Sequence, residues 1–450
     1  MNKLKIVALS LFCGSLLAQV PQEPALSFTL AEAESYAATN SYTVVDKSYE
    51  VDKARQTIKE TAAIGLPQIS GSFGYNYNAQ IQRQPIPAQF FDPTAAEGEI
   101  ALVAFGVAHQ NVAQVQLNQL LLDASYFVAL RATRVFKETK RLEKETAEID
   151  ARKNAAQAYY AVLVAKLSTA VIKENLAVTQ SNFKETRELY KNGFVEQQDA
   201  DQLEILVNNL QANLKQAERQ YELALQVFKF NLGIPLEREV TLTQNIDELL
   251  FSEGTAKAML GNAFNLQQHI VYRSVLSQEK GAQLQVANER AAYYPKLNGF
   301  VSHNQSNFAN ELDQAFSFDT YWIPGTTIGA SLSWNIFTGF SRSAKVQKAK
   351  IDLERIEVAK SSTANQLSLN FEQAKSDFSF QVDNYNNTKR NLELAERIFK
   401  QTTKKYQEGI SSSLELTQAQ NQYLQAESSY INSLLNLLNA KENLENALGQ

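Results

Sequence analysis

The sequence predicts a mostly α-helical chain, built as two tandem copies of one unit, that also contributes four strands to a membrane β-barrel. Gly193 and Gly409 end similar Tyr-x-x-Gly segments 216 residues apart, and the same interval separates two Leu-Gly pairs. Neither glycine nor proline occurs in four long stretches: 107–192, 194–232, 340–408 and 410–448. Long helices require such stretches. Segments of period-two alternation precede the two longest helical runs, as strands would.

The N-terminal segment, 1–18, is interpreted as a secretory signal peptide. Lys3 and Lys5 precede the apolar run from Ile6 to Phe12, and Ala18-Gln19 offers a cleavage point. The alternative is a membrane anchor, but the run is too short to span a bilayer comfortably. Cys13, the only cysteine, would be lost with the signal. Its lipidation is the alternative, although the bulky Phe12 stands where a small residue is expected.

Composition and charge narrow the class of protein further. The net charge of −5 argues against nucleic acid as a partner. Beyond the signal, no segment has 18 consecutive apolar residues, so no transmembrane helix is expected. An exported chain can still cross a bilayer as a closed barrel, because a barrel pairs all of its backbone polar groups internally.

The helical runs carry coiled-coil patterns. A helix from about Asp123 to Lys191 would be roughly 100 Å long at about 1.5 Å per residue. After Gly193, apolar residues recur at spacings of four and three: Leu203, Val207, Leu210, Leu214, Ala217, Tyr221, Ala224 and Phe228. Shifted by 216 residues, the stripe becomes Ala419, Tyr423, Ala426, Tyr430, Ser433, Leu437, Ala440 and Leu444. A period of 3.5 residues predicts helix packed on helix, with each glycine at the tip of a hairpin.

Four segments alternate as strands do. Their apolar residues are Ile69, Phe73, Tyr75 and Tyr77; Val115 and Leu117; Leu297 and Val301; and Ile328, Ala330, Leu332, Trp334 and Ile336. The segment from Lys296 to about Asn304 is the weakest. Aromatic residues near the segment ends favour membrane strands over an ordinary half-buried sheet. The links at 81–110 and 309–325 are interpreted as loops outside the cell.

Four strands are too few for one closed barrel. Membrane barrels have at least eight strands, and open sheet edges are not tolerated in lipid. The chain must therefore self-associate, giving eight strands as a dimer or twelve as a trimer.

The ordered set of features resembles the TolC-like outer-membrane efflux channels of Gram-negative bacteria. The set comprises the signal, the duplicated strand-pair and long-helix unit, the Pro-led strand starts at Pro67 and Pro295, and the Tyr-x-x-Gly tips with an acidic residue six positions on. The resemblance implies a homotrimer with a twelve-stranded barrel in the outer membrane and a helical tunnel in the periplasm. It implies four segments: signal 1–18, first repeat 19–233, equatorial linker 234–257 and second repeat 258–450.

The resemblance also implies roles for the hairpin tips. They would contact a periplasmic adaptor (membrane fusion protein) of an inner-membrane transporter through Tyr190, Gly193, Phe194, Val195, Tyr406, Gly409, Ile410 and Ser411. They would also hold a gate made by Asp199, Tyr406, Glu415 and Gln418. Tyr406 stands at the family's tip tyrosine, Asp199 at that tyrosine's partner, and Glu415 at the first of two acidic positions. The second acidic position is Gln418, and Ser411 replaces the tip arginine, so the gate network departs from the family pattern.

The implied function is the exit duct of a tripartite efflux or type I secretion system, which passively conducts what a pump delivers. An enzyme is not expected, since His109, His269 and His303 fall in no catalytic or zinc motif and no nucleotide-binding loop is present. No cofactor or metal site is expected, and a mature chain without Cys13 and with Met259 as its one methionine disfavours a soft-metal relay. The alternative is a secreted or periplasmic coiled-coil scaffold, which would wash off membranes in salt.

Overall fold

The computed structural model describes residues 25–250, 252–317 and 319–449. The predicted signal peptide and Cys13 lie outside the described residues. The chain divides into two compact units, each of which draws on both sequence repeats. One unit, here the sheet unit, comprises Thr43–Ile149, Asn262–Lys375 and the chain's last few residues. The other, here the tip unit, comprises the described residues up to Tyr42, Asp150–Gly261 and Ser376–Leu444.

The sheet unit contains a four-stranded antiparallel sheet. Its strands are β2 (Gln68–Tyr77), β5 (His109–Leu122), β7 (Lys296–Ala309) and β8 (Ile323–Ser333), and their order in the sheet is β2-β5-β7-β8. All four predicted strands are therefore confirmed, including β7, whose alternation was the weakest. Ile69, Leu117, Val301 and Ile328 are register partners across the sheet, so the apolar residues of both strand pairs share one face.

The predicted loops contain regular structure that the sequence analysis did not expect. The segment 81–110 forms a separate hairpin from β3 (Arg83–Pro87) and β4 (Ile100–Ala104), with the short helix η1 (Ala88–Phe90) after β3, and its end is already part of β5. The segment 309–325 contains the one-turn helix α7 (Leu312–Ala315). α7 packs on β5 and β7, where Asn111 donates a hydrogen bond to the carbonyl of Ala315.

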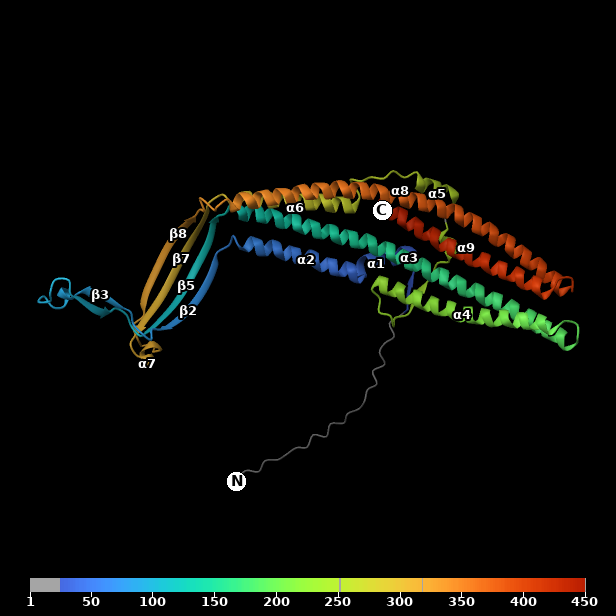
Figure 1. Cartoon of the computed structure of the whole chain (residues 1–450), viewed down its shortest axis with the longest axis horizontal. Coiled ribbons are helices and arrows are strands. Elements are labelled where there is room, and N and C mark those ends of the chain that lie inside the picture. Colours follow the sequence, from blue (N-terminus) through green and yellow to red (C-terminus); the bar gives the residue numbers. More distant parts are fainter. Residues whose placement is uncertain (1–24, 251, 318, 450) are drawn as a thin grey trace, which may run out of the picture. The chain divides into compact units, whose positions relative to one another are not determined.

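Four helices lead away from the end of the sheet that is opposite α7 and the β3–β4 hairpin (Figure 1). They are α2 (Tyr42–Ala63), α3 (Ala124–Lys191), α6 (Ile270–Ala291) and α8 (Ser341–Gln407). Within the sheet unit, ion pairs join neighbouring helices, such as Lys360 with Glu279 at 2.8 Å. Asp123, just before α3, pairs with Lys296 of β7 at 2.8 Å, which fixes the start of the helix against the sheet. α3 and α8 continue in sequence into the tip unit.

In the tip unit, α4 (Gln197–Leu232) follows α3 and α9 (Ser413–Leu448) follows α8, each pair forming a helical hairpin (Figure 1). No residue of either predicted heptad stripe is exposed, so the period-3.5 pattern identified the packed faces correctly. Ser433, the polar member, is satisfied by Thr388, whose hydroxyl lies 2.6 Å from its own. The long helices are thus held by coiled-coil packing.

Short elements close the end of the tip unit that lies away from the tips. They are β1 (Leu26–Phe28), α1 (Leu30–Asn40), β6 (Val240–Leu242), η2 (Ile246–Leu249) and α5 (Glu253–Leu260). β1 and β6 pair in parallel, and Phe28 stacks edge-to-face on Phe228, which does the same with Tyr159. All three aromatic side chains are buried, so they anchor the ends of the long helices.

One helix in the described ranges, α3, contains an 18-residue window apolar enough to cross a membrane by length and composition alone. Of that window, 44% is buried inside the protein. A buried core helix passes the same test.

Candidate functional site: hairpin tips, seam and channel wall

Both hairpin tips close through the same backbone motif. Gly193 and Gly409 have φ of 77° and 74°, the left-handed conformation that the sequence predicts. The N–H of Gly193 donates to Tyr190 at 2.9 Å, and the N–H of Phe194 donates to Leu189 at 3.0 Å. The second tip repeats both bonds at the positions 216 residues later, at 3.0 and 2.8 Å. These are Schellman caps, so each tip is a defined turn rather than a loose loop.

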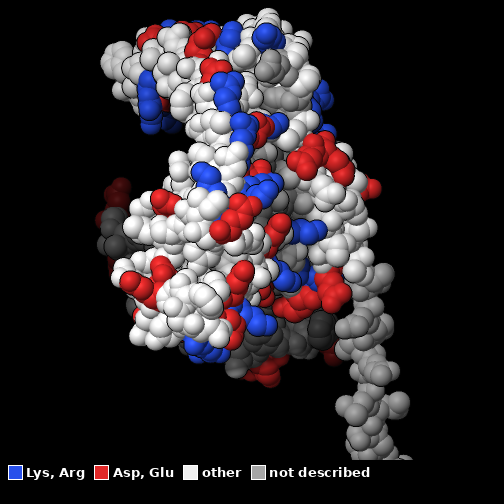
Figure 2. Space-filling view, turned by 90° about the vertical axis from the view of Figure 1, so that its right-hand side faces the viewer, with Lys and Arg blue, Asp and Glu red and all other residues white. Residues whose placement is uncertain are grey.

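The turns present apolar side chains to solvent. Phe194 is 77% exposed and its repeat equivalent Ile410 is 71% exposed. Tyr190 is also exposed, whereas Val195 and Ser411 are half-buried. Figure 2 looks onto this end, where acidic and basic groups are interspersed with uncharged surface. An exposed large apolar side chain at each tip is the kind of surface that a protein partner covers.

Asp199 and Glu415 occupy equivalent positions in the two repeats and cap equivalent helices. The Asp199 carboxylate accepts the N–H of Glu196 at 3.3 Å, completing a capping box at the start of α4. The Glu415 carboxylate accepts the N–H of Ser412 at 3.3 Å and the hydroxyl of Ser411. These two hydrogen bonds hold the pKa of the Glu415 carboxyl below its usual value, and the bond from the Ser411 hydroxyl has the larger effect.

The Tyr406 hydroxyl bonds to a residue other than the one the family resemblance implies. It lies 2.6 Å from the Thr186 hydroxyl of α3, while Asp199 accepts a hydrogen bond from Ser413. Burial raises the pKa of Tyr406, and the nearby charge of Asp199 adds to the increase. Tyr406 and Asp199 are therefore neighbours, but each is bonded to a hydroxyl of the other hairpin. Within one chain, the hydroxyls of Thr186 and Ser413 are the hydrogen-bond partners of Tyr406 and Asp199. The pairing of Tyr406 with Asp199 in a gate stays a prediction. Gln418 is exposed.

These two bonds belong to a longer polar seam between the hairpins. On α3, Asn175, Thr179, Asn182 and Thr186 are at most 6% exposed and are spaced four, three and four residues apart. On α9, Ser413, Gln420 and Glu427 are buried at spacings of seven. Asn175 donates to Glu427 at 2.9 Å, and Gln420 donates to Thr179. The seam thus contributes hydrogen bonds at intervals of one heptad.

This seam was not predicted from the sequence, because its residues are polar and the predicted stripes are apolar. The heptad signal was present in polar residues, as Ser413, Gln420 and Glu427. By contrast, apolar clusters pack beside the seam: Leu176, Leu206, Val207 and Leu210 form one, and Leu203, Phe399, Leu416 and Ala419 form another. Buried polar residues at heptad positions fix the register of packed helices at some cost in stability.

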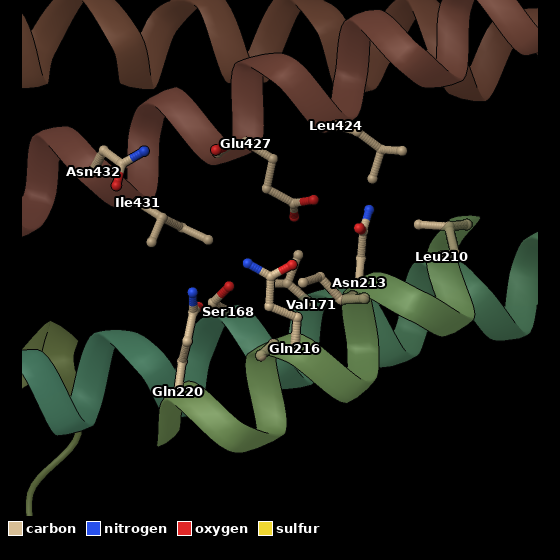
Figure 3. Close-up of a pocket in the computed structure, with 13 residues that line it drawn as sticks. Ser168, Val171, Leu210, Asn213, Gln216, Gln220, Leu424, Glu427, Ile431 and Asn432 are labelled. Atoms are coloured by element: carbon tan, nitrogen blue, oxygen red, sulfur yellow. The ribbon is translucent and has the colours of Figure 1, made fainter. Parts of the chain in front are cut away.

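Glu427 is the only carboxylate of the seam's α9 row and adjoins a cavity. A space of about 340 Å³ lies between α9 and the α3–α4 hairpin, and Glu427 extends into it beside Val171 and Gln216 (Figure 3). The Tyr423 hydroxyl donates to the same carboxylate at 3.0 Å. Burial, reinforced by the charges of Glu174 and Glu396, raises the pKa of Glu427.

In the sheet unit, the face opposite the apolar row is lined by amides and hydroxyls. Gln114 donates to Ser302 at 3.0 Å, and Gln116 donates to Asn118 at 2.9 Å. Ser70 and Ser72 are register partners of Gln116 and Gln114. A sheet with one apolar and one polar face is the wall of a water-filled membrane barrel. The fold and the tips together define a membrane channel with a helical extension.

Comparison with known proteins supports that class. The family model for outer membrane efflux proteins matches residues 35–233 and 266–450, so the chain belongs to this family. It is an outer-membrane efflux channel of the kind used by tripartite efflux systems, it extends into the periplasm, and it is not an enzyme. The alternative of a coiled-coil scaffold is set aside by the family match. A search of curated protein sequences finds no match.

Solved channels share the fold. VceC from Vibrio cholerae is 15% identical, with 93% of this chain and 96% of that chain covered and a TM-score of 0.68. The CmeC outer-membrane channel of Campylobacter jejuni is 16% identical, covering 93% and 85%, with a TM-score of 0.71. The open-state MtrE outer-membrane channel of Neisseria gonorrhoeae is 16% identical, covering 93% and 88%, with a TM-score of 0.71. Each shows the TolC-like fold with long helices and a four-stranded sheet per chain.

Proposed function

We propose that three copies of this chain form the exit duct through which an inner-membrane transporter, joined by a periplasmic adaptor, expels its substrate. The observation that carries the proposal is the open four-stranded sheet. Its edge strands, β2 and β8, run antiparallel to each other, because strand direction alternates along β2-β5-β7-β8. β8 of one copy and β2 of the next therefore continue the alternation. Three copies close twelve strands with no edge left in lipid.

The tips are proposed as the end that meets the adaptor and gates the duct. Their apolar turns are fixed by Schellman caps, so the Phe194 and Ile410 side chains are presented without an ordering cost. The hydrogen bonds of Tyr406 with Thr186 and of Ser413 with Asp199 tie the two hairpins together just behind the tips. Opening the duct would require these bonds to break or exchange partners.

The side of the outer membrane on which each end lies can be tested by labelling in intact cells. A cysteine at Thr94, in the exposed connection between β3 and β4, should react with a membrane-impermeant maleimide. A cysteine at Gln198, exposed beside the first tip, should react only after the outer membrane is permeabilised. The single natural cysteine lies in the predicted signal, so it should not compete. If Gln198→Cys reacts in intact cells and Thr94→Cys does not, the tips face the cell exterior and the proposed orientation is wrong.

Glu415 is proposed to line the constriction at the tips. In a trimer, three copies of this exposed carboxylate would approach one axis, where like charges raise one another's pKa and attract cations. Glu415→Gln should lower cation preference and divalent-cation block in single-channel recordings. Glutamine still completes a capping box, so α9 and the assembly should be preserved.

The matched control is Glu408→Gln, an exposed acidic residue on the same tip that caps no helix. It should change selectivity less than Glu415→Gln. Normal conductance with unchanged selectivity and block in Glu415→Gln would show that Glu415 does not line the constriction, without affecting the assignment as a channel.

A further inference from the structure

The turn between β8 and α8 exposes an unusual concentration of large apolar side chains. Ile336 is 83% exposed, Phe337 76% and Phe340 77%. The equivalent connection of the first repeat is shorter and more polar, since Asp123 there caps α3 and pairs with Lys296. Large apolar groups this exposed on a single turn require a partner surface.

The turn is held in this exposed conformation. Arg342 donates to the carbonyl of Asn335 at 2.9 Å, and its guanidinium lies over the Tyr293 ring at 5.5 Å from the centroid. The indole N–H of Trp334 donates to the Tyr293 carbonyl at 3.1 Å. Phe340 has a φ of 65°, the single positive value at a non-glycine position in the described ranges. A strained, anchored conformation that exposes a phenyl ring indicates a surface role.

The exposed turn directly follows the membrane-facing row of β8. Ile328 and Leu332 lie on the apolar face of the sheet, β8 ends at Ser333, and Trp334 and Ile336 come immediately after it in the chain. In an outer-membrane channel this face contacts lipid. The turn is therefore continuous with an interface that the membrane already covers.

The second strand pair also needs additional apolar height. His303 and its register partner Thr326 interrupt the apolar face, whereas β2 places Phe73, Tyr75 and Tyr77 on that face. From Ile328 to Leu332 the apolar positions of the strand rise about 10 Å along the membrane normal, given about 3.4 Å per residue and a tilt of about 40°. The apolar band of such barrels is about 25 Å tall. Residues 334–340 follow directly after this short apolar stretch.

Basic residues follow the turn immediately. The charged residues of the first three turns of α8 are all basic: Arg342, Lys345, Lys348 and Lys350. Cations near the start of a helix oppose its dipole, so this arrangement is unfavourable without an anionic partner. Lys345 and Lys348 are exposed on one face, and neither makes an ion pair with the part of the chain that the structure describes.

We propose that residues 334–348 form a phospholipid-binding element at the periplasmic edge of the barrel. Ile336, Phe337 and Phe340 insert among the acyl chains of the inner leaflet. Lys345 and Lys348 bind the phosphates of the same lipids, since they lie one to two helical turns beyond the apolar residues. Arg342 is a positioning residue that holds the turn.

Insertion is tested by spin labelling in phospholipid vesicles. A nitroxide on Phe337→Cys should collide with oxygen in preference to a water-soluble nickel chelate, as a label on the lipid-facing Ile69→Cys should. A label on Gln198→Cys provides the water-exposed reference. Preference for the nickel chelate would overturn the proposal, and so would protection from both reagents, which would place the turn against a neighbouring copy. Ile336→Cys repeats the test if Phe337→Cys does not assemble.

Phosphate binding is tested by counting bound phosphatidylglycerol on the detergent-purified channel by native mass spectrometry. Lys345→Gln/Lys348→Gln should bind the lipid more weakly, by about fivefold per lysine, which is the contribution of a basic residue near an anionic leaflet. Lys389→Gln/Arg390→Gln, an exposed basic pair further along α8, is the charge-matched control. Equal binding by wild type and both variants, or equal loss in both variants, would overturn the proposal. Single-channel conductance should be normal in both variants. A negative result for lipid binding can therefore be distinguished from a failure of the proposed duct function.

Discussion

A Gly233→Ala channel is expected to be severely depleted from the outer membrane. Gly233 ends α4 with a φ of 75°, and a Cβ at this position would lie 2.3 Å from the carbonyl oxygen of Asn40. The clashing atom belongs to the backbone, so a side-chain rotation cannot relieve it. Left-handed strain costs about 1–2 kcal/mol and overpacking typically about 1–3 kcal/mol. Together they remove a large part of a stability of about 5–15 kcal/mol.

The control is Gly193→Ala, which has the same backbone conformation but no atom within 4 Å of the added Cβ. This variant should lose only the stability that the left-handed backbone strain costs. The measurements are immunoblots of outer membranes and thermal denaturation of whatever protein can be purified. Equal abundance and melting of the two variants would contradict the close approach of α4 to α1.

The second large effect is expected from Asn175→Leu. Asn175 and Tyr423 are the hydrogen-bond donors recorded for the Glu427 carboxylate, which is 8% exposed. Removing one hydrogen-bond donor from a buried carboxylate costs about 1–3 kcal/mol, because the charge is left with fewer partners. The tip unit should therefore unfold at a lower temperature at pH 8, measured by circular dichroism of the solubilised channel.

The loss of stability caused by Asn175→Leu should be larger at high pH than at low pH. Because burial raises the pKa of Glu427 above 4.5, the folded state binds this proton more tightly than the unfolded state. Stability from this group is fully present below pH 4.5 and is lost as the pH rises through the higher folded pKa. Asn175→Leu should thus destabilise less at acidic pH, and adding Glu427→Gln should restore part of the stability at pH 8. A pH-independent loss would show that Glu427 is not the charged group responsible.

The sequence predicted the elements whose signals are periodic and local. The heptad stripes identified the packed faces of α4 and α9, and Gly193 and Gly409 marked tips because each residue has to adopt a left-handed conformation. The strands were found by alternation, including the weak β7, whose polar residues line the channel side. These features are properties of single segments, so the sequence alone contains them.

The features that were missed depend on pairing between segments. The β3–β4 hairpin was interpreted as a loop, since its segment contains Pro85 and Pro87. A two-stranded ribbon nevertheless tolerates proline at its edges. The bonds of Tyr406 to Thr186 and of Ser413 to Asp199 join residues more than 200 positions apart. A single sequence does not specify which hydroxyl reaches which partner. The seam at Ser413, Gln420 and Glu427 did have a local signal, in polar residues spaced by seven.

The central claim, that the four-stranded sheet closes only through identical copies, is tested most directly by the mass of the detergent-solubilised particle. Native mass spectrometry, with detergent and lipid removed in the gas phase, should give three chains, each close to 50.3 kDa less the predicted signal. Twelve strands then close the barrel. A particle of one or two chains that still conducts ions in planar bilayers would contradict the trimer and the barrel built from it.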